Sequence, residues 1–138
     1  MYEAGDARKT FFTLSGGNNY TRKHLDRYGN VPVLRLAEMY LTRAEANFRN
    51  NTAIGAEPLS DINRIRARVG LPVLSSLTLD AITKERYLEL AFEGHNLHEA
   101  KRLQKSVGAL SWNSPKLILP IPQREMDVNK SLVQNEGY

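Results

Sequence analysis

The sequence contains no cysteine among its 138 residues. This absence excludes disulfides, thiolate metal ligands and cysteine nucleophiles together, and it leaves the redox compartment open. No apolar run approaches the roughly 18 consecutive residues that a membrane-spanning helix needs. Residues Met1–Asp6 have neither the basic start nor the apolar centre of a secretory signal. We therefore expect either a cytoplasmic chain or a piece of a longer protein whose signal lies elsewhere.

Aromatic residues are also few, at 8%, and charge is not concentrated in one sign or one region. The formal net charge is +4, and the basic residues are spread from Arg8 to Lys130. A nucleic-acid binder usually concentrates positive charge on one face. In the densest basic group, Arg64 and Arg68 share a helix face while Arg66 points away from it. We therefore expect no nucleic-acid partner.

Apolar residues recur at helical spacing through the middle of the chain and predict an all-α fold. The first series of apolar residues at this spacing predicts a helix that begins after Pro32 and ends near Asn50 and Asn51. Three more helices are expected at about 58–69, 79–93 and 95–105. Thr78 can cap the third of them, and Gly94 separates it from the fourth.

The two ends of the chain lack this periodicity. Residues 1–32 read as an irregular arm, with short extended pieces possible at 9–14. Residues 106–138 read as an extended, proline-containing tail, with a turn of helix possible near 124–128. We expect one domain over 1–138, made of the arm 1–32, a helical core 33–105 and the tail 106–138.

Three glutamates, Glu85, Glu89 and Glu93, are spaced to share one helix face. Paired carboxylates can perform general acid–base chemistry when their surroundings separate their pKa values. Like charges at this spacing repel each other, however, and nearby arginines could neutralise them. We favour structural ion pairs, which can fix helix registry when buried. The residues expected to form them are Arg35, Glu38, Arg64, Arg68, Glu85, Glu89 and Glu93.

No other group of residues indicates chemistry. His95, His98 and Glu99 could hold zinc, but the sequence offers no further ligand motif. No nucleophile elbow or phosphate-binding loop is present. We therefore predict no catalytic residue, no metal, no cofactor and no enzyme activity.

A glycan site would need exposed aromatic rings beside polar groups. The candidates are Trp112, Tyr20 and Tyr28. Trp112 lies in a polar turn, although it could equally anchor the tail onto the helices. Tyr40 and Tyr87 are expected to belong to the core or to a seam between helices.

Five motifs occur in a specific order: VLRLAEMYLTRAEA at 33–46, DINRIRARVGL at 61–71, ERYLELAFEG at 85–94, KLILPIP at 116–122 and QNEGY at 134–138. This series resembles the C-terminal region of SusD/RagB-like proteins of the Bacteroidetes. The resemblance runs from about Pro32 to Tyr138 and extends more weakly to Asp6, Arg8 and Lys23.

The resemblance implies tetratricopeptide-like helix pairs in a lipid-anchored protein on the surface of the outer membrane. It also implies non-catalytic binding of an oligosaccharide or other nutrient, in partnership with a TonB-dependent transporter. Members of that family are several times longer and begin with a signal and a lipidated cysteine, which this chain lacks. We therefore expect exposed apolar surface, and with it self-association or a mobile arm over 1–30.

A second hypothesis is a helical-repeat protein–protein interaction module without a small-molecule site of its own. The pattern E-x-Y-L-x-x-A occurs at Glu38 and again at Glu85. Repeated helical hairpins build solenoid folds, whose surfaces commonly bind other proteins.

Overall fold

The computed structural model describes residues 2–138, and this part of the chain is mostly helical. It contains five α-helices, two short 3-10 segments and one two-stranded hairpin. The contacts divide it into two units, one ending at Glu93 and the other spanning Gly94–Tyr138. Every buried residue among those described lies in the first unit, so the second has no core of its own. The single domain expected over 1–138 stays a prediction.

Helix α1 spans Leu36–Asn50 and buries Leu41 and Ala44. It begins later than expected because Arg35, at the N-cap, has an extended backbone. Leu34 therefore lies outside the helix and is 76% exposed. The predicted end is confirmed: Asn51 adopts a left-handed conformation at φ 51°, which asparagine tolerates better than most residues.

Helices α2, Pro58–Arg68, and α3, Leu79–Glu89, follow the predicted starts. Pro58 occupies the first turn of α2, where its missing N–H would be unpaired in any case. The Thr78 hydroxyl accepts a hydrogen bond from the Ala81 N–H at 3.1 Å and caps α3. Helix α3 ends before the expected residue 93, and Phe92 in the segment that follows has a positive φ of 64°.

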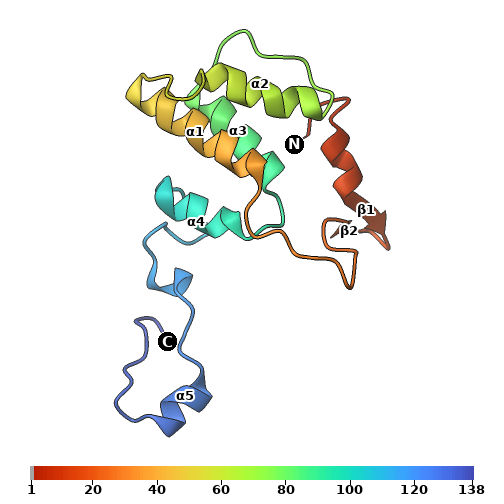
Figure 1. The fold of residues 1–138 in the computed structure, drawn as a ribbon. Helices are drawn as coiled ribbons and strands as arrows, with labels where there is room; N and C mark the ends of the chain where they lie inside the picture. The colour runs from red at the N-terminus through yellow and green to blue at the C-terminus, as the bar shows by residue number, and fades with distance from the viewer. Residues whose placement is uncertain (1) are drawn as a thin grey trace. The chain divides into compact units, whose positions relative to one another are not determined.

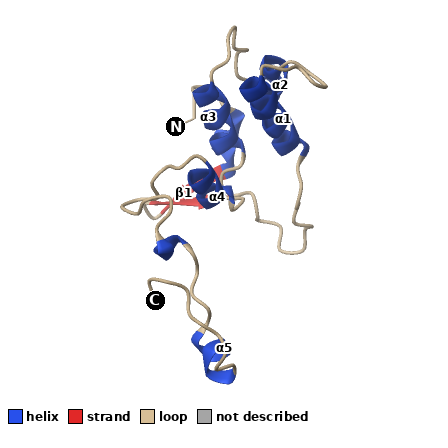
Figure 2. Cartoon of the chain, turned by 90° about the vertical axis from the view of Figure 1, so that its left-hand side faces the viewer, coloured by secondary structure: helices blue, strands red, loops and turns tan. Residues whose placement is uncertain are grey.

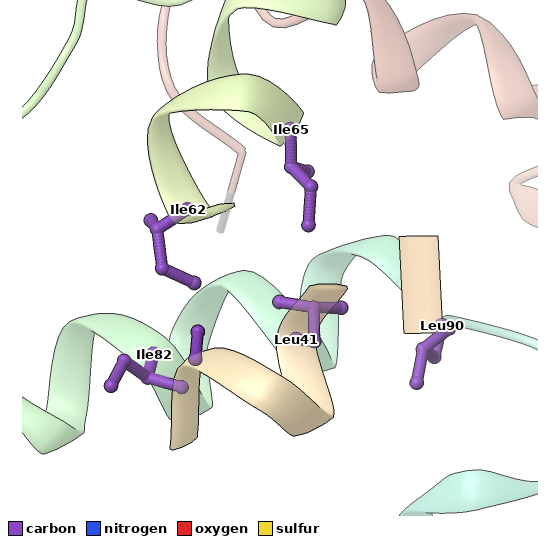
Figure 3. Packing of buried hydrophobic residues seen from close by; sticks show 6 residues of the cluster. Leu41, Ile62, Ile65, Ile82 and Leu90 are labelled. Carbon is purple, nitrogen blue, oxygen red and sulfur yellow. The ribbon is translucent and has the colours of Figure 1, made fainter. Parts of the chain in front are cut away.

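The core lies where α1 packs against both α2 and α3 (Figure 1). Its six buried residues are Leu41, Ala44, Ile62, Ile65, Ile82 and Leu90 (Figure 3). Burying an isoleucine or leucine side chain contributes about 1.5–3 kcal/mol. The predicted all-helical class is confirmed, whereas the tetratricopeptide-like stacking of helix pairs stays a prediction.

The arm is more regular than expected. Residues Ala7–Phe11 form a 3-10 segment, and β1, Phe12–Ser15, pairs antiparallel with β2, Asn18–Thr21. Both residues of the connecting Gly16–Gly17 turn have positive φ, as a two-residue hairpin turn often requires. The arm therefore has local order over Ala7–Thr21 that was not predicted, although β1 overlaps the extended piece thought possible at 9–14.

The second unit contains α4, His95–Arg102, a 3-10 turn at Pro115–Leu117, and α5, Gln123–Val128 (Figure 2). The turn of helix predicted near 124–128 is confirmed by α5. The Gln134 side chain closes a loop by bonding both the N–H and the carbonyl oxygen of Ile121, at 2.8 and 2.9 Å. None of the helices within residues 2–138 has the length and apolar character needed to cross a bilayer.

Candidate functional site, a charge network beside an arginine-lined cleft

Three carboxylates follow one face of α3 and the segment after it. Glu85 is 2% exposed and Glu89 is fully buried. Glu93 lies just beyond the helix, and its side chain is partly exposed. Burying an ionised carboxylate without a partner is very costly, so we expect cations near Glu85 and Glu89.

Arg8, from the N-terminal arm, is the first of these cations. Its fully buried guanidinium donates three hydrogen bonds to Asp6. They run from Nε to Oδ1 at 2.9 Å, from Nε to Oδ2 at 3.2 Å and from Nη2 to Oδ2 at 2.7 Å. Its Nη1 also lies 2.7 Å from Glu85 Oε1 and 3.6 Å from Glu89 Oε2. The contact with Glu85 lacks hydrogen-bond alignment, so it acts mainly through charge.

The pKa values of Arg8 and Asp6 depend on the charges next to them. Burial alone would lower the pKa of Arg8, but Asp6 and Glu85 outweigh burial and raise it. For Asp6, burial alone would raise the pKa. The hydrogen bonds from Arg8 outweigh burial, so the pKa of Asp6 is lowered. Both groups are therefore held in their charged forms.

The other end of the carboxylate face binds the segment between the hairpin and α1. Arg35 contacts Glu89 at 3.2 Å and Glu93 at 2.8 Å. Lys23 contacts Glu93 at 2.7 Å and also donates to the Glu89 carbonyl oxygen at 2.7 Å. The chain leading into α1 is thus attached to the end of α3.

Arg66, on α2, extends the network toward the start of the chain. It pairs with Glu85 at 3.3 Å and with Glu3 at 3.0 Å, and Lys84 lies 3.1 Å from Glu3. Hydrogen bonds from Arg66 and then Lys84 lower the pKa of Glu3 to about 2. The connected network contains six cations and five carboxylates. Its effect is to tie the arm, the start of α1 and helix α2 to α3.

An aromatic cluster supports the same attachment. The rings of Tyr2 and Phe12 lie 5.4 Å apart, as do those of Phe12 and Phe92. The Tyr2 hydroxyl donates to the Leu88 carbonyl oxygen at 2.9 Å, and burial raises its pKa. Polar and apolar contacts therefore hold the arm against α3 together.

The residues named for ion pairing have different surroundings. Arg35, Arg68, Glu85, Glu89 and Glu93 all belong to the network, with Arg68 at 2.6 Å from Glu89. Glu38 on α1 lies 3.6 Å from Arg86 on α3.

Arg64 differs from the expectation. It donates to the Tyr40 hydroxyl at 2.7 Å and lies 5.1 Å from the centre of that ring. No carboxylate partner for it is found within residues 2–138. The reason is positional: Arg64 meets α1 at Tyr40, one helical turn before Arg68 reaches Glu89.

A cleft of about 240 Å³ opens between the start of α1 and the later turns of α2. Its lining residues are Arg35, Leu36, Ala37, Tyr40, Arg64, Ile65 and Arg68. Sequence reasoning missed this site. It expected Tyr40 in the core or a helix seam, and the ring does pack against the core, but it also lines the cleft. The available signal was the pair Arg64 and Arg68, one helical turn apart, whereas the approach of Tyr40 depends on the packing of α1 against α2.

The aromatic residues proposed for ligand binding lie elsewhere. Tyr20, on β2, is 55% exposed, and Tyr28, in the turn after Asp26, is 92% exposed. Trp112 belongs to the second unit and is 37% exposed. None of the three lines the cleft, and their role in ligand binding stays a prediction.

Metal ligands do not gather in the part of the chain that the structure describes. No group of three or more His, Cys, Asp or Glu side chains there is arranged to hold an ion. His24 instead lies with Nε2 3.1 Å from the Phe92 carbonyl oxygen. His95 and His98 both lie on α4.

Comparison with known proteins identifies the family. The SusD family model matches residues 8–117, which is most of the chain. The protein belongs to the SusD family. The match includes Arg8, the helices that build the charge network and the residues that line the cleft, whereas Glu3 and Asp6 lie just before it.

Two curated relatives agree with this assignment. A SusD-like protein of Bacteroides ovatus is 41% identical over 71 residues, which are 51% of this chain and 13% of that protein. The starch-binding protein SusD of Bacteroides thetaiotaomicron is 31% identical over 123 residues, which are 79% of this chain and 22% of that protein. The chain thus spans less than a quarter of the length of either relative.

Solved structures share the fold. A SusD superfamily protein from Parabacteroides distasonis has a TM-score of 0.73 at 22% identity, covering 99% of this chain and 40% of that one. The surface glycan-binding protein A of Bacteroides uniformis has a TM-score of 0.69 at 23% identity, covering 97% and 38%. A SusD-like protein from Bacteroides fragilis is 30% identical with a TM-score of 0.55, covering 76% and 25%.

Proposed function

We propose that this chain is a non-catalytic, ligand-binding part of a nutrient-uptake system at the surface of the outer membrane. In this proposal it captures a glycan and passes it to a TonB-dependent transporter. The observation that carries the proposal is membership of the SusD family over residues 8–117, together with a relative named as a starch-binding protein. A structural neighbour named as a surface glycan-binding protein is consistent with it.

The charge network supports binding rather than chemistry. The carboxylates that could have served as an acid and a base, Glu85 and Glu89, are buried and shared among arginines. A catalytic carboxylate must reach a substrate, and these side chains are closed off from solvent. Their contacts instead hold the arm, which carries the exposed Tyr20, in a fixed place against the helices.

Capture would rest on aromatic stacking against sugar rings. Aromatic faces combine a large apolar surface with little conformational entropy to lose on binding. Tyr20 in the first unit and Trp112 in the second are the partly exposed rings that we propose to test, each within its own unit.

Isothermal titration with maltoheptaose and a panel of neutral and acidic oligosaccharides tests the proposal. We expect saturable binding of at least one glycan, and chromatography should recover that glycan unchanged. Tyr20→Ala or Trp112→Ala should weaken binding by about tenfold, which corresponds to about 1.4 kcal/mol. Tyr87→Ala is the matched control, because Tyr87 is also exposed but lies on α3. Cleavage of any glycan would overturn the non-catalytic reading.

A second candidate function, a protein-interaction module, is favoured by one specific observation. Val31, Val33, Leu34 and Leu36 are all at least 66% exposed just before and at the start of α1. Exposed apolar residues grouped in this way commonly mark protein contact sites. Retention of the transporter on immobilised chain without glycan would favour this function, provided that Val33→Ser reduces it. Glycan binding without any such retention would favour the first function.

A further inference from the structure

The cleft between α1 and α2 is lined by arginines, and two of them have guanidinium N–H groups that make no hydrogen bond within the described part of the chain. Arg35 has little left to offer, because it donates through Nε to Glu93, through Nη1 to Glu89 and through Nη2 to the Glu89 carbonyl oxygen. Arg64 makes one hydrogen bond, to Tyr40, and Arg68 makes one, to Glu89. A guanidinium has five N–H donors, so these two residues retain most of theirs.

The local charge is positive. The only carboxylate that Arg68 contacts within residues 2–138 is Glu89, which is fully buried and shared with Arg8 and Arg35. The network as a whole already has one more cation than it has carboxylates, and Arg64 adds another without a carboxylate partner. An anion in the cleft would therefore meet Arg64, which has no carboxylate partner among the described residues, and Arg68, which shares its one carboxylate with two other arginines.

The remaining walls suit a small ring. Leu36, Ala37 and Ile65 supply apolar surface, and Tyr40 adds an aromatic ring with a hydroxyl group. The volume of about 240 Å³ is just below the range of about 300–1,000 Å³ that is usual for drug-sized ligands. A single substituted ring fits these dimensions better than a long chain does.

We propose that this cleft binds the carboxylate or sulfate group of one acidic sugar residue, with Arg64 and Arg68 as its charged donors. Guanidinium groups match both anions because their planar N–H pairs can bind two oxygens at once. The apolar walls would meet the ring, and the Tyr40 hydroxyl lies beside Arg64 to contact the ring's polar substituents. This inference rests on the proposed function of glycan capture, and it adds the class of glycan.

The experiment compares trigalacturonate, a sulfated disaccharide, a neutral galactotriose and inorganic sulfate by isothermal titration. Arg64→Gln and Arg68→Gln are the test variants. Arg124→Gln is the matched control, because Arg124 is an exposed arginine in the second unit. We expect an acidic sugar to bind more tightly than galactotriose, and each test variant to weaken that binding by about tenfold or more. The control should bind as the unaltered chain does, and added salt should weaken binding.

Two further measurements keep the result decisive. Arg64→Lys should restore only part of the affinity, since lysine keeps the charge but cannot bind two oxygens in a plane. Side-chain Nε resonances of Arg64 and Arg68 should shift on titration with the acidic sugar, while that of Arg124 stays fixed. If Arg68→Gln fails to fold because Glu89 loses a partner, Arg64→Gln carries the test alone, since Arg64 has no carboxylate partner among the described residues.

Several outcomes would overturn the inference. Equal affinity for neutral and acidic sugars, or acidic-sugar binding that ignores both variants, removes the cleft as the site while leaving glycan capture intact. Inorganic sulfate binding as tightly as the sugars shows that no sugar is recognised. Absence of binding by any glycan overturns the inference and the proposed function together.

Discussion

Replacing Arg8 with methionine tests whether the charge network holds the arm to the helices. The substitution keeps an unbranched side chain of similar length and removes the charge. Among the described residues, the Asp6 carboxylate then keeps only the backbone N–H of residue 8, at 3.0 Å, as a hydrogen-bond donor. Glu85 keeps Arg66, and Glu89 keeps two arginines. Removing one member of a buried ion pair typically costs about 3–5 kcal/mol, because the remaining charge is left uncompensated. We expect a loss of that size in the free energy of unfolding.

Urea denaturation of Arg8→Met and of the unaltered chain measures this loss, provided that each variant unfolds in one cooperative transition. Lys130→Met is the control, because Lys130 is 80% exposed and its i,i+3 partner Asp127 is 62% exposed. Such surface pairs contribute about 0.3–0.5 kcal/mol. Adding Asp6→Asn to Arg8→Met should recover part of the loss, since a neutral amide needs no cation. A loss below about 1 kcal/mol for Arg8→Met would refute the reasoning, because a buried charge cannot lose its partner so cheaply.

Three further predictions concern pH, the core and a helix cap. The pKa of Glu3 falls from 4.5 to about 2 on folding, so its pairing stabilises the fold above pH 4.5 and this contribution is lost as the pH falls toward 2. In urea denaturation across that range, the free energy of unfolding of Glu3→Gln should change less with pH than that of the unaltered chain. An identical dependence on pH would contradict the pairing. Ile62→Ala should cost about 2–5 kcal/mol because Ile62 is fully buried, and Ile62→Val about 0.5–1.5 kcal/mol; equal losses would argue against the described packing. Thr78→Ala should cost about 1 kcal/mol by removing the cap of α3, with Thr78→Ser as the control that retains it.

The helices were the most predictable part of the fold. The starts of α2 and α3 follow from Pro58 and Thr78, and the end of α1 follows from Asn51. These signals are local, because a cap or a proline acts on the backbone next to it. The hairpin was not predicted, although an extended piece was thought possible at 9–14. Residues 12–15 alternate between apolar and polar side chains, but each strand has only four residues, and the second strand depends on pairing across Gly16–Gly17.

The site was less predictable than the fold. The spacing of Glu85, Glu89 and Glu93 shows that they share a face, but it does not say which cations reach them. Arg35 and Glu93 are 58 positions apart in the sequence, and their contact depends on how the chain returns past the end of α3. Arg8 gave no local sign of burial, because arginine is ordinarily a surface residue. Its position follows only from the packing of the arm.

Glu89 connects parts of the chain that are distant in sequence. Its carboxylate is shared by Arg8 of the arm, Arg35 before α1 and Arg68 of α2. Charges that share one partner are thermodynamically linked. If one arginine binds Glu89 less strongly, the ion pairs of the other arginines with Glu89 change as well. An anion that draws Arg68 into the cleft would therefore leave Glu89 more strongly bound to Arg8. Hydrogen exchange at the arm amides would then slow on ligand binding, so the arm could report occupancy of a cleft that it does not line.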